Sequence, residues 1–282
     1  MNQIKRFLFK NIDIKAQYLS VGSVWKKIIK GRGYNQITQK MLGEICSLGI
    51  ILANGMKHNG KIILQIQGTG KVSLLFVEVD NKLNIRGFAR ENGKIIDGNL
   101  IDILGDTQIV ITLYNSQTKS NFQSIIPLNK NGLIDTFEDY FTNSDQIDSK
   151  FLITTNNDNL SAILIQKLPK SGNKTKEQSV DDWERVNILL TTITDKELQT
   201  LALEELLLRV FSEDDIEVFD GSLIEYQCQL NLDKFAKIII DMGEDEARKI
   251  LSENGVIAIN NEICNENIVF SKNDVEKIFI KD

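Results

Sequence analysis

Three cysteines, Cys46, Cys228 and Cys264, are the side chains of this sequence best suited to metal, redox or nucleophilic chemistry. Cys46 falls in a strongly apolar segment, where a cysteine usually serves as a small core residue. Cys228 and Cys264 stand in "YQCQL" and "EICNE", each without a second cysteine close by. A structural zinc site needs three or four nitrogen or sulfur ligands, and paired thiolates two or three residues apart supply them. The spacing alone therefore leaves three interpretations: a broken zinc site, a two-thiol switch, or two inert cysteines.

Other reactive motifs do not combine into a catalytic site, so the sequence predicts that the protein is not an enzyme. The single histidine, His58, has no obvious catalytic partner in the sequence. "GTGK", from Gly68 to Lys71, lacks the full glycine spacing of a nucleotide-binding loop, and Val72 stands where Ser or Thr is needed. This segment also joins two expected strands, so we interpret it as a turn and expect no nucleotide cofactor.

Charge argues against nucleic acid as a partner. The net charge is −6 and the pI is about 5.1, whereas phosphate binding depends on clustered Lys and Arg. The helices expected on either side of Met242–Gly243 resemble a helix-turn-helix. The second of them opens with Glu244, Asp245 and Glu246, which would repel phosphates but suit a helix N-terminus. We therefore expect a plain helical hairpin there.

Localisation is inferred from missing signals. The N-terminal "MNQIKRFLFKN" has too short an apolar run for a secretory signal. No apolar segment reaches membrane-spanning length, and three cysteines are few for a secreted disulfide-rich protein. The expectation is a cytoplasmic protein with no membrane partner.

The first 169 residues alternate between strand and helix patterns. A helix is expected over 37–57, where apolar residues recur at intervals of three and four. Two hairpins are expected at 61–80 and 107–129, with a further strand near 84–94 between them. A helix at 133–147 and strands at 150–155 and 160–169 complete this part. The sequence thus predicts an α+β domain over 1–169.

A change in composition marks the next part. Residues 170–182 are polar and glycine-containing, as in a flexible linker. Helices are expected at 181–193 and 195–211, which makes 170–215 a flexible and then helical linker. From 216 to 282 we expect a small C-terminal unit of short strands and helices, with Gly243 and Gly255 at helix ends and a capping box at Ser271 and Asp274.

The order of these segments resembles the bacterial redox-regulated holdase chaperone family, the heat-shock protein of about thirty-three kilodaltons. The resemblance runs from about Lys30 to the C-terminus. It is carried by "LANGMKHNGKIILQIQGTGKVSLLFVEVD", "IRGFAR", "IIPLNKNGLIDTFEDYFTNSDQI", "LIQKLP", Trp183, "LLTTITDKEL", "LLLRVF", "YQC", "DMGEDEARKIL" and "ICNENIVFSKNDVEKIF".

The resemblance implies an N-terminal client-binding domain, a redox-sensitive linker and a C-terminal zinc-binding redox-switch domain. It also implies unfolded proteins as partners, no use of ATP, and a homodimer in the activated state. The family's four zinc cysteines form two pairs, whose oxidation releases the metal. Cys228 and Cys264 match one member of each pair, whereas Leu230 and Asn261 occupy the other two positions. Both disulfides within the pairs and a four-cysteine zinc site are therefore excluded.

Three arrangements stay open for the remaining thiols. In the first, the thiolates of Cys228 and Cys264, together with water or Asn261, still hold zinc weakly. Former ligands of one ion should be neighbours, so a disulfide between Cys228 and Cys264 is geometrically conceivable and would lock the small domain. The simpler hypothesis is that Leu230 and packing replace the metal, and that heat loosens the domain.

The functional prediction is an ATP-independent holdase that binds unfolding proteins under oxidative or heat stress. The alternative is a thiol-redox or metal-binding protein that uses Cys228 and Cys264. Client binding is assigned to apolar faces of the α/β body and of the linker, and the linker residues are Leu198, Leu201, Leu206, Leu207 and Phe211.

Overall fold

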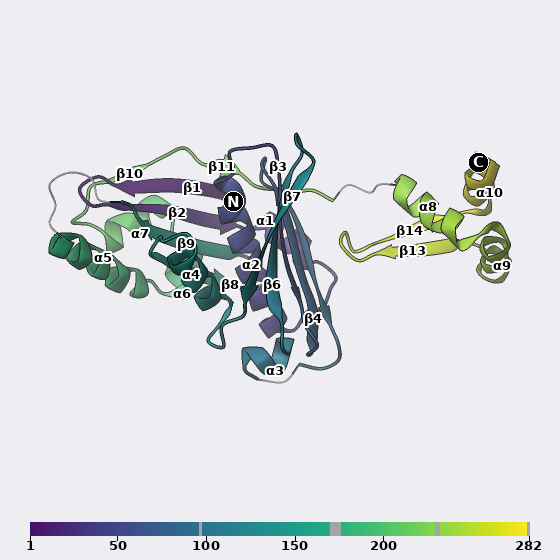
Figure 1. Cartoon of the computed structure of the whole chain (residues 1–282), viewed down its shortest axis with the longest axis horizontal. Helices are drawn as coiled ribbons and strands as arrows, with labels where there is room; N and C mark the ends of the chain where they lie inside the picture. Colours follow the sequence, from purple (N-terminus) through teal and green to yellow (C-terminus); the bar gives the residue numbers. More distant parts are fainter. Residues whose placement is uncertain (96–97, 170–175, 229–231, 281–282) are drawn as a thin grey trace. The chain divides into compact units, whose positions relative to one another are not determined.

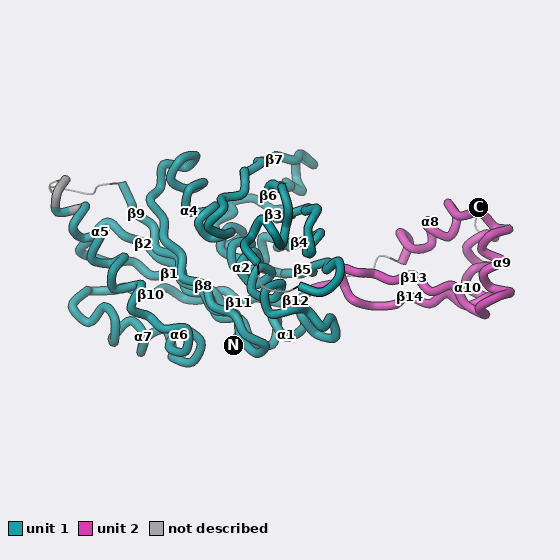
Figure 2. Tube along the Cα trace, turned by 90° about the horizontal axis from the view of Figure 1, so that it is seen from below, with its two compact units in different colours: residues 1–226 teal, residues 227–282 magenta. Residues whose placement is uncertain are grey.

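The structure is a computed structural model that describes residues 1–95, 98–169, 176–228 and 232–280. The chain divides into two compact units, Met1–Tyr226 and Gln227–Asp282, which are coloured separately in Figure 2. The fold class is α+β, as the sequence predicts (Figure 1).

One antiparallel sheet of the first unit brings the two ends of that unit together. Its order is β10-β1-β2-β9-β8, and β11 also pairs with β1. The bounds are Asn2–Phe9 (β1), Ile14–Val21 (β2), Ser149–Thr155 (β8), Leu160–Lys167 (β9), Ile216–Val218 (β10) and Ser222–Leu223 (β11). β9 reads "LSAILIQK" and is buried along almost its whole length, because layers cover both faces of this sheet.

The second sheet of this unit combines a β3–β4–β5 meander, a β6–β7 hairpin that pairs with β3, and the added strand β12. Its order is β12-β5-β4-β3-β6-β7. The bounds are Gly60–Gln67 (β3), Val72–Asp80 (β4), Asn84–Glu91 (β5), Gln108–Asn115 (β6), Ser120–Pro127 (β7) and Glu225–Tyr226 (β12). Both expected hairpins are confirmed, and the GTGK segment is a turn between β3 and β4.

The helix α2, Gln36–Asn54, joins the two sheets into one core. It contacts β3, β4 and β5 of one sheet and β8 and β9 of the other, and Figure 1 shows it between them. The side chain of Asn35 caps it by accepting a hydrogen bond of 2.9 Å from the backbone of Ile37. Three further helices, α1 (Ser23–Ile29), α3 (Leu100–Leu104) and α4 (Leu133–Asn143), cover the margins of this core.

The linker segment is more helical than its composition indicates. Residues 170–175 lie outside the described residues, but the polar stretch expected to be flexible is helical from Lys176 onward, in α5 (Lys176–Thr191). The helix expected over 195–211 is two helices, α6 (Asp195–Thr200) and α7 (Leu203–Val210), with Leu201 extended between them. In a single straight helix Leu198 and Leu203 would point about 140° apart, whereas the break at Leu201 allows both to be buried.

The first unit extends past residue 216, where the sequence interpretation placed the start of the C-terminal part. The strands β10 and β11 pair with β1, and β12 pairs with β5. Along the chain, the boundary between the two compact units lies between Tyr226 and Gln227 instead. Short strands at the end of a sheet depend on partners far away in sequence, which local patterns do not reveal.

The second unit is a helical hairpin followed by a β-hairpin and a last helix. The bounds are Leu232–Met242 (α8), Glu244–Asn254 (α9), Ile257–Asn261 (β13), Glu266–Phe270 (β14) and Lys272–Ile280 (α10). Gly255 is left-handed at the end of α9, and Ser271 with Asp274 forms the expected capping box. The buried apolar core of its described residues is small: Ile239, Ala247, Ile257, Ile268, Phe270 and Val275. In the described part of the whole chain, none of the helices has the length and apolar character of a membrane span.

Candidate redox site and covered apolar face

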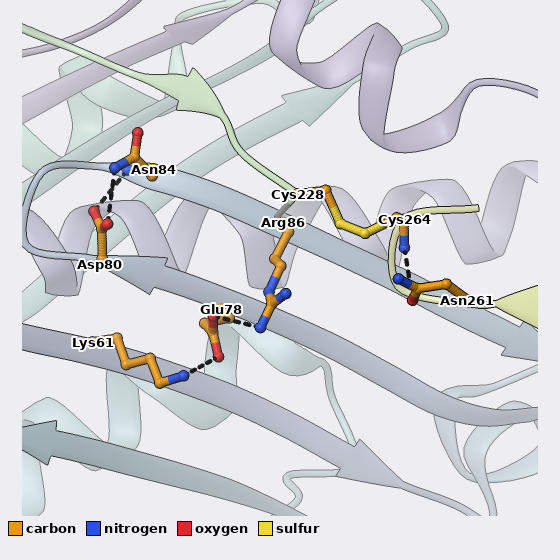
Figure 3. A network of polar contacts seen from close by, with 8 residues as sticks. All are labelled: Lys61, Glu78, Asp80, Asn84, Arg86, Cys228, Asn261 and Cys264. Atoms are coloured by element: carbon orange, nitrogen blue, oxygen red, sulfur yellow. Dashed lines mark hydrogen bonds and ion pairs between the residues drawn. A yellow bond between two sulfur atoms is a disulfide. The ribbon is translucent and has the colours of Figure 1, made fainter. Parts of the chain in front are cut away.

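The second unit contains a disulfide between Cys228 and Cys264, with 5.6 Å between the two Cα atoms (Figure 3). Cys228 follows β12 closely in the chain, and Cys264 lies in the turn between β13 and β14. Cys264 is 7% exposed and Cys228 is half-buried. The bond therefore ties the start of the second unit to the tip of its β-hairpin.

Asn261 holds the turn that carries Cys264. Its Oδ1 accepts hydrogen bonds from the backbone N–H groups of Ile263 (3.2 Å) and Cys264 (3.4 Å), and Figure 3 shows the second of them. An asparagine that bonds its own following backbone in this way forms an Asx turn. Asn261 thus orients the backbone that carries the disulfide-bonded Cys264.

The donors that remain do not fit the zinc site implied by the resemblance. The two sulfurs are bonded to each other, and the Asn261 oxygen is already engaged by backbone N–H groups. Among the described residues, His, Cys, Asp and Glu side chains form no group of three or more able to hold a metal ion. Leu230, the residue assigned to fill the former metal position, lies outside the described residues.

Cys46 is a core residue, as expected. It is fully buried in α2, and burial raises the pKa of its thiol well above the ordinary value because the thiolate would lose its hydration. This thiol is therefore unreactive in the folded protein.

The leucines assigned to client binding form an apolar layer over the outer face of the first sheet. Leu198, Leu206, Leu207 and Phe211 are buried and Leu201 is half-buried. They pack on the side chains of β1, β2 and β9 that point away from α2. Those sheet residues are Phe7, Phe9, Ile14, Ala16, Tyr18, Ile163 and Ile165. The rings of Phe9 and Phe211 meet edge to face at 5.3 Å. The structure thus brings the assigned residues together and covers them.

Polar contacts at the margin hold this layer in place. Lys5 of β1 reaches Glu204 of α7 at 2.6 Å. Gln199 of α6 donates to Thr154 Oγ1 at 2.9 Å and accepts from Asn156 Nδ2 at 2.6 Å. These contacts are partly exposed, and exposed pairs contribute little, so the apolar packing beneath them carries most of the attachment.

Glu44 is a buried carboxyl group that the sequence interpretation did not single out. It lies within α2 and is 7% exposed, with Lys40 Nζ at 4.0 Å. Burial raises the pKa of Glu44 to about 7; the charge of Lys40 opposes this rise and that of Asp135 adds to it. In the sequence, the feature that indicates this buried carboxyl group is a glutamate inside an otherwise apolar helix pattern.

A cross-strand ion network braces the outer face of the second sheet (Figure 3). Glu78 of β4 accepts from Lys61 of β3 at 2.8 Å and pairs with Arg86 of β5 at 2.9 Å. Glu78 lies directly opposite Arg86 and diagonally across from Lys61, and both kinds of cross-strand contact stabilise the pairing of strands. The network has a structural role, because it links three neighbouring strands.

Fold and site together define a class: a sheet-and-helix body with a covered apolar face, followed by a small unit held by one disulfide. The profile of the family described as "Hsp33 protein" matches residues 2–271. The chain belongs to this family.

Relatives agree with this placement over nearly the full length. The 33 kDa chaperonin of Shewanella sp. (strain W3-18-1) is 30% identical over 282 residues, covering 99% of this chain and 96% of that protein. That of Nitrosococcus oceani is 27% identical over 279 residues, covering 99% and 94%. The crystal structure of the 33 kDa chaperonin from Thermotoga maritima superposes with a TM-score of 0.79, at 16% identity and with complete coverage of both chains. This last similarity supports the fold.

Proposed function

We propose that this protein is an ATP-independent holdase, which binds unfolding proteins under heat or oxidative stress and keeps them from aggregating. Membership of a family whose relatives carry the name 33 kDa chaperonin supports this proposal. The observation that carries it is the apolar layer between the first sheet and α5–α7. A holdase needs an apolar surface that is hidden at rest and can be uncovered.

In this proposal clients bind where α6 and α7 now lie. Release of these helices would free Leu198, Leu206 and Phe211 on the helices and Phe7 and Phe9 on the sheet. The body, residues 1–169, would then act as the client-binding domain and residues 170–215 as the removable cover. The residues from 216 onward would act as the regulatory part. The first strands of this part, β10–β12, pair with strands of the first unit.

Regulation is proposed to differ from the switch that the resemblance implies. Oxidation of Cys228 and Cys264 forms one bond between the two former pairs, releasing two protons and two electrons to an oxidant such as a peroxide. A bond across the small unit restrains its unfolding. Oxidation therefore stabilises this unit, and heat rather than oxidation loosens the cover.

Aggregation of a thermolabile client such as citrate synthase tests the proposal. Light scattering is followed at raised temperature with the full chain, with and without peroxide, and bovine serum albumin serves as the inert protein control. Suppression by the heated protein in both redox states is expected. Absence of suppression under every condition removes the holdase.

A second candidate is a thiol-redox protein that uses Cys228 and Cys264, and the disulfide itself favours it over a metal-binding protein. Replacing both cysteines by serine separates the candidates, because a holdase of the proposed kind keeps its protection without them. Elemental analysis of the reduced, purified protein should find zinc well below one ion per chain, since two thiols are too few for a structural site.

A further inference from the structure

The strand β7 forms an edge of the second sheet that the described part of the first unit leaves uncovered. It is the last strand in the order β12-β5-β4-β3-β6-β7, and Figure 2 shows it at the rim of its sheet. Its eight residues, "SNFQSIIP", span about 26 Å at roughly 3.3 Å per residue. An edge of this length offers a row of backbone donors and acceptors to another strand.

The other long edges of this unit are protected. On β5, the strand β12 pairs with Asn84 and Ile85, and the Tyr34 hydroxyl bonds the N–H (2.9 Å) and the C=O (3.0 Å) of Ala89. On β8, the backbone N–H of Phe151 donates to Glu138 of α4 at 2.9 Å. The edge of β1 is met by β10 and β11. β7 differs from these three edges in the lack of such protecting contacts among the described residues.

The hydrogen-bond alternation decides which backbone groups of β7 face outward. Ser116 donates to the carbonyl of Asn59 at 3.0 Å, so the even-numbered residues of β6 bond toward β3 and the odd-numbered residues toward β7. Leu113 of β6 and Phe122 of β7 are therefore a hydrogen-bonded pair. Asn121, Gln123 and Ile125 therefore turn their N–H and C=O groups away from β6. Pro127 also belongs to these outward-facing residues, so its lack of an N–H group removes no hydrogen bond to β6.

The side chains of β7 suit an apolar, uncharged partner. Phe122 is 65% exposed and Ile125 is 61% exposed, and they project from opposite faces of the sheet. The strand carries no charged residue, although charge is the usual protection of an edge. Half-buried Val110 of β6 lies directly opposite Ile125 and extends the apolar surface inward.

We propose that β7 is a docking edge, to which an extended, apolar segment of an unfolding protein adds as a further strand. An unfolding chain supplies what the edge lacks: free backbone groups and alternating apolar side chains. The inference rests on the proposed holdase function and gives it a binding surface that does not require α6 and α7 to move.

The test measures binding of a peptide to the full-length chain. The probe is a fluorescein-labelled nonapeptide of alternating valine and threonine, followed by fluorescence anisotropy; a second version carries N-methyl groups on alternate residues and so lacks one hydrogen-bonding edge. Gln123→Pro removes an outward N–H and obstructs the edge, whereas the matched control Gln123→Thr keeps that N–H. We expect Gln123→Pro, and the methylated peptide on the unchanged protein, each to weaken binding by about tenfold. Gln123→Thr should bind like the unchanged protein.

A second variant keeps the test decisive if Gln123→Pro does not fold. Ile125→Lys places a charge on an exposed position of the edge and should also weaken binding by about tenfold. Equal binding of both peptides, or full binding by Ile125→Lys, would overturn the inference. So would a homodimer that Gln123→Pro dissociates while peptide affinity is unchanged, because the edge would then belong to a second copy. The anisotropy result is independent of citrate synthase protection, so failure of the edge and failure of the holdase can be told apart.

Discussion

At the scale of single residues, the second unit is crosslinked by one disulfide between Cys228 and Cys264. Two positions that would complete the family's cysteine pairs hold Leu230 and Asn261, and the two surviving cysteines are joined to each other. The small apolar core of the second unit makes such a crosslink important, since a single core in a unit of this size contributes only a few kcal/mol of stability.

The first prediction concerns this disulfide. Its cysteines are separated by 36 positions, and closing a loop of that length stabilises a fold by about 4 kcal/mol in the chain-entropy estimate. Reduction by dithiothreitol should therefore speed amide hydrogen exchange across residues 232–280, measured by mass spectrometry, and leave the first unit unchanged. The Cys228→Ser variant should exchange at the fast rate with or without dithiothreitol. Equal exchange in the oxidised and reduced proteins would contradict a stabilising role.

The second prediction concerns Glu44. Its pKa is raised from the ordinary 4.5 to about 7 in the folded protein, so the unfolded state loses this proton first. Below about pH 4.5 Glu44 is protonated in both states and does not lower the free energy of unfolding. As the pH rises, Glu44 lowers the free energy of unfolding increasingly, and the full effect is reached above about pH 7. Glu44→Gln should therefore raise the free energy of unfolding by up to about 3 kcal/mol at pH 8 and change it little at pH 4.5. Urea unfolding at the two pH values measures this, with the exposed Glu184→Gln as the control.

At the scale of elements, the cover is built from helices that bury one face each. In α7 the neighbouring leucines differ sharply: Leu206 is fully buried and Leu208 is 74% exposed. The polar contacts around the cover are partly exposed, so the buried leucines determine how readily α6 and α7 detach.

The third prediction compares the buried Leu206 with the exposed Leu208. Leu206→Ala should destabilise the docked helix by roughly 2–5 kcal/mol because it leaves a cavity against the sheet. Binding of the dye ANS and protection of citrate synthase should then both begin at a lower temperature. Leu208→Ala, the same substitution two positions away, should leave both onset temperatures unchanged. Identical behaviour of the two variants would show that docking of α7 does not control activity.

At the scale of the whole molecule, the two compact units have cores of very different size. Among the residues that the structure describes, the first unit contains two extensive apolar clusters, whereas the second contains a single small one. Stability is not uniform in such a chain, and the unit with fewer buried contacts is expected to open first.

The fourth prediction is that the second unit unfolds ahead of the body. Calorimetry of the reduced protein should show a small transition below the main one, and oxidation should move the small transition upward. Truncation after Tyr226 should remove the small transition and preserve the main one. A single transition for the reduced full-length protein would contradict independent unfolding of the second unit.

Local patterns were enough for much of the body and for the class of the protein. The helix at 37–57, both hairpins and the α4 segment follow from periodicity and turn residues, which act over short distances along the chain. The cysteine spacing, read with the family resemblance, also identified Cys228 and Cys264 as potential neighbours.

Tertiary structure alone decided the rest, because those features depend on contacts between distant residues. Pairing of β10–β12 with β1 and β5 moved the boundary of the first unit from 216 to 226. Burial against the first sheet divided the expected 195–211 helix at Leu201 and covered the assigned client-binding leucines. The order of the strands left β7 at an edge. A sequence specifies which residues are apolar, but only packing determines which apolar surfaces meet each other and which remain open to a partner.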